Sequence, residues 1–183
     1  MEKCWAKLHG NYAKIDGAFA REPLHDLSGA PSKTYKPDAG KSAHTDKNKH
    51  IWKRIKDGEE KDHAMCAGSI YFEEETSEAE EMEEVKGLIP GHIYTLIAAL
   101  KFKIKGKKEK VVKLRNPWGD HGIILLINHL EWKGALCDSD PVWNTIKQKT
   151  KDKIGYDNKE NDGIFFMYYQ DFVDNFDDVT ICF

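Results

Sequence analysis

The sequence has few of the features that identify metal-binding, secreted, membrane or nucleic-acid-binding proteins. Its 183 residues include only four cysteines, and none of them forms a CxxC pair, so neither a zinc knuckle nor a disulfide framework is indicated. No apolar run approaches the roughly 20 residues of a membrane span, and the first residues have no signal-peptide character. The net charge of −3 favours neither nucleic acid nor an anionic membrane as partner. We therefore expect reduced thiols and a cytoplasmic setting.

What is present is enough for one folded domain of ordinary size, because 40% of the residues are hydrophobic and 11% are aromatic. Helical spacing of apolar side chains predicts helices at Cys4–Ile15 and Asp46–Glu60. Residues 22–40 carry three prolines and are expected to be mostly irregular. Strands are expected at residues 66–72, 93–104, 108–117, 163–169 and 177–183, with residues 122–127 as strand or buried loop and a short helix within 143–155. This order predicts an α+β fold built on an antiparallel sheet, either open or closed into a barrel.

An acidic run separates the first two of these strands. Eight glutamates lie between Glu73 and Glu84, and like charges at this density repel one another and extend the chain. A solvated loop is the ordinary interpretation. Because the run ends shortly before His92, a gating role at that residue stays open.

Two short segments carry the clearest chemical signal. GLIPGHIYTLIAA contains His92, KLRNPWG contains Asn116, and a hairpin-sized KIKGKKEK stretch separates them. Each segment is typical of a strand end, so neighbouring strands present an imidazole and a side-chain amide. A cysteine protease needs both groups beside its thiolate, because the imidazole takes the thiol proton and the amide fixes the imidazole tautomer. No glutamine- and glycine-rich segment followed by Cys-Trp, the usual setting of the nucleophile, occurs in the chain.

These segments, together with LEWKGALCDSDPVWN, DGIFFMYYQDF and the final DDVTICF, resemble the second half of the protease core of calpains. The opening EKCWAKLHGNYAKIDG and DLSGAPS resemble the stretch where that half begins. The resemblance covers nearly the whole chain, in the family's order. It implies one domain over residues 1–183, an antiparallel barrel-like subdomain that supplies histidine and asparagine. It also implies that the cysteine comes from a preceding subdomain, normally in the same chain.

The resemblance assigns roles to His92, Asn116 and Trp118, and a physical argument adds Gly91. His92 matches the general base and Asn116 matches the amide that orients it. Trp118 matches a tryptophan beside this pair, where an aromatic wall excludes water and strengthens the hydrogen bond between imidazole and amide. Gly91, directly before His92, leaves room for a substrate backbone to pass close to the strand.

Calpains also carry a calcium site in this half, and the chain keeps its pattern only in part. Glu131, Asp138 and Asp162 fall on carboxylate ligand positions, and Glu160 falls where the family uses a main-chain carbonyl. The last acidic ligand is replaced by Ile164, whose side chain supplies no oxygen. Calcium takes six to eight oxygen ligands. We therefore expect calcium to bind weakly here, if it binds.

Two functional hypotheses follow. In the first, the chain is part of a calpain-like cysteine endopeptidase that acts on protein substrates, and it is inactive alone because it lacks the nucleophile. Cys66 and Cys182 lie in apolar strands and should be inert, and nothing near Cys4 or Cys137 in the sequence would lower the pKa of the thiol as a nucleophile requires. In the second, the chain is a non-catalytic calpain-like module for protein binding or assembly, as the change at Ile164 would allow.

Overall fold

A computed structural model of the chain describes residues 2–15, 17, 19–70, 86–118, 131–159 and 162–183. The α-helices are α1 (Glu2–His9), α2 (Arg21–Ser28), α3 (Asp46–Glu60), α4 (Gln148–Ile154) and α5 (Tyr169–Asn175), and the short 3-10 helices are η1 (Tyr12–Lys14) and η2 (Pro141–Thr145). The strands are β1 (Ser32–Tyr35), β2 (Met65–Ser69), β3 (Ile93–Ile104), β4 (Lys107–Arg115), β5 (Ile164–Tyr168) and β6 (Phe176–Cys182). Residues 122–127, which were expected to form a strand or a buried loop, lie outside the described residues, as does the acidic run Glu73–Glu84.

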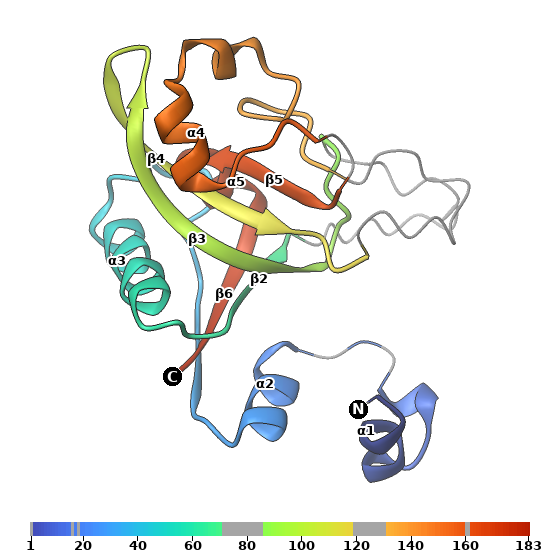
Figure 1. The fold of residues 1–183 in the computed structure, drawn as a ribbon. Coiled ribbons are helices and arrows are strands. Elements are labelled where there is room, and N and C mark those ends of the chain that lie inside the picture. Colours follow the sequence, from blue (N-terminus) through green and yellow to red (C-terminus); the bar gives the residue numbers. More distant parts are fainter. Residues whose placement is uncertain (1, 16, 18, 71–85, 119–130, 160–161) are drawn as a thin grey trace, which may run out of the picture.

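The six strands form one antiparallel sheet in the order β1-β6-β2-β3-β4-β5 (Figure 1). The α+β fold on an antiparallel sheet is therefore confirmed. In the part of the chain that the structure describes, β1 and β5 are the edges of the sheet and do not pair with each other, so the sheet stays open. Within the same residues, no helix is both long and apolar enough to cross a membrane.

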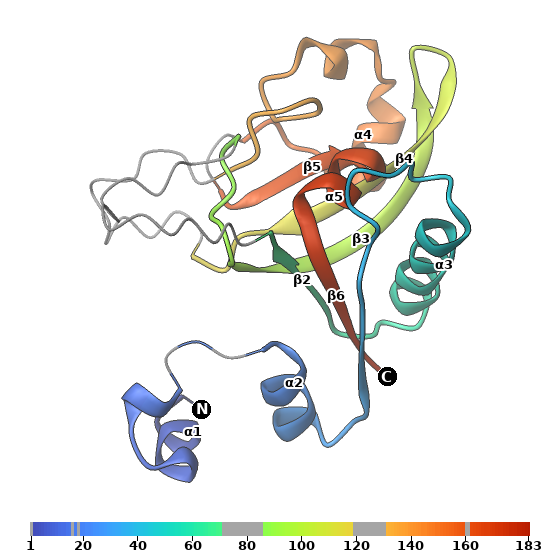
Figure 2. The ribbon, with the colours of Figure 1, turned by 180° about the vertical axis from the view of Figure 1, so that it is seen from behind.

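Both faces of the sheet are covered, because side chains alternate between the two faces along a strand. In β5, Phe165 and Met167 belong to a large core that also includes side chains of α3 and α5, whereas Phe166 belongs to a second core with η2 and α4. Figures 1 and 2 show α3 and α4 on opposite sides of the curved β3–β4 hairpin. The two cores fix the strand ends on which the candidate site depends.

The helix predicted at Asp46–Glu60 is confirmed as α3, and its bounds follow from local chemistry. Thr45 Oγ1 caps the helix by accepting the Asn48 N–H at 3.2 Å, which satisfies one of the donors left unpaired at a helix start. Ile51 and Ile55 lie one turn apart and are both buried in the large core. The helix therefore packs through one stripe of its surface.

Two predictions near the N-terminus were wrong. The helix expected at Cys4–Ile15 is divided, because Gly10 takes a φ of +105° and Asn11 starts the separate turn η1 by accepting the Lys14 N–H. The stretch expected to be irregular contains α2 and β1. Gly29, with a φ of +70°, ends α2 in the manner of a glycine C-cap. The strand β1 exists because β6, about 150 residues away in the chain, pairs with it, and local sequence does not reveal that partner.

Candidate active site

His92 lies directly before β3, in a backbone position that is fixed on two sides. It follows Gly91, whose φ of +63° lies in the left-handed region that favours glycine. The His92 N–H donates to Ser69 Oγ at 2.9 Å, and the His92 C=O accepts the Ser69 N–H at 2.9 Å. The imidazole therefore starts from an anchored main chain.

Asn116 lies directly after β4, on the strand next to His92. The antiparallel register places Thr95 opposite Arg115, so the beginning of β3 lies beside the end of β4. Asn116 is 2% exposed, and its N–H donates to the Gly163 C=O at 2.8 Å. The His92 Nε2 and the Asn116 Oδ1 are 3.1 Å apart. The structure thus brings the two predicted side chains into hydrogen-bond contact.

The Trp118 main chain determines which way this amide points. Its N–H donates to Asn116 Oδ1 at 3.1 Å, and a donor requires an oxygen, not the NH₂ group, at that place. Because the same oxygen can only accept, His92 Nε2 must carry the imidazole proton. The remaining nitrogen, Nδ1, is then the basic one, and no residue in the described part of the chain is hydrogen-bonded to it.

Two aromatic rings enclose the imidazole. The Tyr94 ring meets it edge-on at 5.0 Å between centroids, and the Trp118 ring lies at 4.5 Å with a 54° tilt. Burial lowers the pKa of His92 below its ordinary 6.5, and the hydrogen bond to Asn116 acts in the opposite direction. The neutral imidazole is therefore the resting form at pH 7. Trp118 keeps 42% of its surface exposed, so this wall borders solvent.

The carboxylates predicted as calcium ligands come close enough to affect one another's charge. Two of them already accept hydrogen bonds from main-chain N–H groups. The Glu131 carboxylate accepts the Gly163 N–H, and Asp162 Oδ1 accepts the Ile164 N–H at 2.7 Å. The pKa of Asp138 is raised to about 8, first by burial and then by the charge and hydrogen bond of Glu131. Asp138 therefore holds its proton to a higher pH than an exposed aspartate does.

This arrangement does not fit calcium. Across the described ranges, no group of three or more histidine, cysteine, aspartate or glutamate side chains could hold a metal ion. Glu160 lies outside the described residues. Calcium takes six to eight oxygens and favours charged carboxylates, whereas Ile164 offers no side-chain oxygen and the carboxylates of Glu131 and Asp162 already accept main-chain N–H groups.

The cysteines show no sign of an activated thiol. Burial, followed by the charges of Asp178 and Cys182, raises the pKa of Cys66 to about 12, which is the wrong direction for a nucleophile. Cys182 is also buried, Cys137 is half-buried and Cys4 is exposed. No hydrogen bond joins any of the four to His92 within the described residues.

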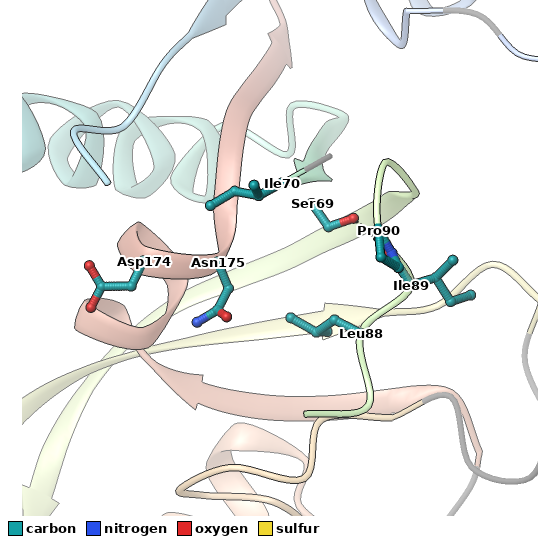
Figure 3. A pocket seen from close by; sticks show the side chains of 7 residues that line it. All are labelled: Ser69, Ile70, Leu88, Ile89, Pro90, Asp174 and Asn175. Atoms are coloured by element: carbon teal, nitrogen blue, oxygen red, sulfur yellow. Dashed lines mark hydrogen bonds between the residues drawn. The ribbon is translucent and has the colours of Figure 1, made fainter. Parts of the chain in front are cut away.

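Sequence reasoning missed two residues beside the site, Ser69 and Tyr94. Ser69 also lines a pocket with Ile70, Leu88, Ile89, Pro90, Asp174 and Asn175 (Figure 3). Tyr94 could have been found, because a side chain two positions after His92 lies on the same side of a strand. Ser69 gave no such signal, since its contact with His92 spans 23 residues.

The whole chain is similar to known proteins. A family model described as calpain family cysteine protease matches residues 1–183. Calpain-B of Drosophila melanogaster is 33% identical over 186 residues, covering 100% of this chain and 18% of the relative. Calpain-8 of Homo sapiens is 32% identical over 188 residues, covering 100% and 23%. Calpain clp-4 of Caenorhabditis elegans is 31% identical over 184 residues, covering 100% and 23%. The chain thus spans about a fifth of the length of these relatives.

Proposed function

Because the chain belongs to the calpain family of cysteine proteases, we propose that it supplies the general base His92 and the orienting amide Asn116 of a cytoplasmic endopeptidase. Residues 1–183 act as one domain, the second half of a protease core. The nucleophilic cysteine comes from a preceding half, and the cleft forms between the two. Protein chains are the substrates.

The observation that carries this proposal is the contact between His92 Nε2 and Asn116 Oδ1 at 3.1 Å. It leaves Nδ1 as the proton acceptor, in an imidazole that burial keeps neutral. A histidine with a purely structural role has no need of a buried amide that the Trp118 N–H holds in one orientation. These are the properties required of a general base beside a thiol.

The His92 Nδ1 carries the proton in both stages of the reaction, the formation of the thioester and its hydrolysis. Nδ1 takes the thiol proton while the sulfur attacks the substrate carbonyl, and the resulting imidazolium is stabilised by Asn116 Oδ1. As the C–N bond breaks, Nδ1–H gives its proton to the departing amine, and a thioester remains. Water then attacks the thioester with Nδ1 again as base, which releases the acid and restores the thiol.

The test is reconstitution with a separately produced cysteine-bearing half. We expect peptide hydrolysis from the mixture, no hydrolysis with His92→Ala, and reduced hydrolysis with Asn116→Ala, because the amide orients the base without carrying the proton. His44→Ala is the matched control, since that histidine is exposed and should leave the rate unchanged. Full activity of His92→Ala in a folded mixture would overturn the assignment.

The alternative is a non-catalytic binding module, and one observation favours it. Ile164 occupies an acidic ligand position of the family, and no metal-binding group is found in the described residues. Under this hypothesis the two halves associate without producing hydrolysis. Association measured by calorimetry, with no cleavage at any pH between about 6 and 8, the range in which histidine titrates, would select the module over the protease.

A further inference from the structure

Ser69 makes four hydrogen-bond contacts that hold the loop carrying the imidazole, including one of 3.2 Å from its hydroxyl to the His92 C=O. Its side chain, 4% exposed at the end of β2, accepts the His92 N–H at 2.9 Å and donates to the Ile89 C=O at 2.5 Å. Its own N–H donates to the His92 C=O at 2.9 Å. Both main-chain polar groups of His92 therefore bond to this one residue.

The position of Ser69 depends on an irregularity in the sheet. The pairing of β2 with β6 shifts register between Gly68 and Ser69, so that Ser69 lies opposite Phe176 and not Asp177. Bulges of this kind re-aim a side chain near the end of a strand. Here the re-aimed hydroxyl reaches the loop that precedes β3.

Tyr94 holds the same loop from the other side. Its hydroxyl accepts the Ile89 N–H at 2.9 Å, so the two polar groups of Ile89 end on two buried hydroxyls, those of Ser69 and Tyr94. The Tyr94 ring also meets the His92 ring at 87°. Tyr94 is fully buried, so the hydrogen bond to its hydroxyl attaches the loop to the packed core.

Leu88 of this loop packs into the large core, but an open pocket borders the loop on its remaining side. Figure 3 shows the Leu88 side chain extending toward Asn175 in a small, solvent-open pocket that Ile89, Pro90 and Asp174 also line. Interiors filled to ordinary density resist displacement through contact alone. Beside the pocket, the loop has fewer contacts that resist its displacement. The hydrogen bonds of Ser69 and Tyr94 therefore contribute to fixing its position.

We propose that Ser69 is the positioning residue of the imidazole and that Tyr94 assists it. The Ser69 hydroxyl fixes residues 89–92, so that the His92 Nε2 stays within hydrogen-bond distance of Asn116 and the His92 Nδ1 stays free. Neither hydroxyl touches the reacting atoms. The catalytic meaning rests on the proposed function of His92. The positional claim itself does not, because it concerns the ring in this chain alone.

The experiment is ¹⁵N NMR of the imidazole in the 183-residue chain, which reports the tautomer and the pKa of His92. In Ser69→Ala we expect the ratio of the Nε2–H to the Nδ1–H form to fall roughly threefold to tenfold, the range of one net hydrogen bond. The pKa should rise toward 6.5, because burial is the main cause of its lowering. Ser69→Thr keeps the hydroxyl and should restore both values.

Thr180→Val is the matched control, since Thr180 is 2% exposed and its hydroxyl bonds Thr34 Oγ1 at 2.8 Å in the same sheet. It should lower stability as Ser69→Ala does and leave the His92 spectrum unchanged. Tyr94→Phe removes only the second hydroxyl and gives an independent reading, which decides the matter if Ser69→Ala fails to fold. An unchanged His92 spectrum in folded Ser69→Ala or in folded Tyr94→Phe would overturn the proposal.

Reconstituted activity separates this inference from the proposed function. If His92 is the base, Ser69→Ala should lower kcat and shift the acidic limb of its pH profile upward, with little change in KM. If the NMR changes appear but the reconstituted wild type cleaves nothing, the proposed function fails and the positional claim stands.

Discussion

The imidazole of His92 and the amide of Asn116 meet at 3.1 Å across 24 residues of chain. The contact joins the start of β3 to the end of β4, which the antiparallel register of the hairpin places side by side. A half of the proposed protease core can therefore assemble its base and orienting group before a thiol is present. This makes the electronic state of His92 measurable in the isolated chain.

Substitution of Asn116 should move the pKa of His92 in a direction set by the new side chain. Asn116→Asp places a buried carboxylate against the imidazole and should raise the pKa, whereas Asn116→Ala removes the hydrogen bond that raises it and should lower it further. NMR titration measures both. Asn158→Asp adds the same charge at an exposed position and should have little effect. A fall in the pKa with Asn116→Asp would contradict the predicted geometry.

His92 should also contribute to the pH dependence of stability. Its pKa is lower in the folded chain than its ordinary 6.5, so the unfolded state binds more protons between these two values. The contribution is fully present above pH 6.5 and is lost as the pH falls through the folded-state pKa. Urea unfolding at stepped pH should show this loss in the wild type. In His92→Gln, which cannot titrate, the loss should be smaller, and equal slopes would contradict the prediction.

The sequence predicted well what local pattern determines. The helical stripe of Ile51 and Ile55 and the strand ends at His92 and Asn116 are all read from short segments, and the structure has these elements. It could not predict β1, whose partner β6 is about 150 residues away, nor the contact of Ser69 with His92, which depends on a shift of register between β2 and β6. Pairing between distant strands is not visible in local sequence.

Gly87 should be intolerant of any side chain. It has a φ of +85°, and a Cβ at this position would lie 1.8 Å from the Glu131 main-chain oxygen. Gly87→Ala should therefore lose about 1–2 kcal/mol to the backbone conformation and about 1–3 kcal/mol more to the collision. Gly106→Ala is the control, because its φ of +82° is similar and no atom lies within 4 Å. Equal losses of unfolding free energy would show that the collision is absent.

Asp138 should make the chain lose stability as the pH rises from about 4 to about 8. Its pKa is raised from 3.8 to about 8, so the folded state holds a proton that the unfolded state releases, and stability falls as pH rises through that interval. Asp138→Asn should remove the fall, as measured by urea unfolding from pH 5 to 9.

Calcium should bind no more tightly than roughly millimolar, the weak end of protein sites. A micromolar, stoichiometric site lost in Asp138→Ala would contradict this.

The chain alone should cleave no peptide bond. His92 and Asn116 can move a proton but cannot form a thioester, and the raised pKa of Cys66, about 12, leaves that thiol protonated at pH 7. Cys182 is buried, and the hydrogen-bond partners of its Sγ in the described residues are Ser28, Leu24 and Ala30, none of which is a base. Casein and a fluorogenic peptide, each with and without calcium, test for cleavage, and an epoxide that alkylates activated thiols tests for a nucleophile. Epoxide labelling of one cysteine, lost in His92→Ala, would place a working thiol within this chain and remove the need for a second half.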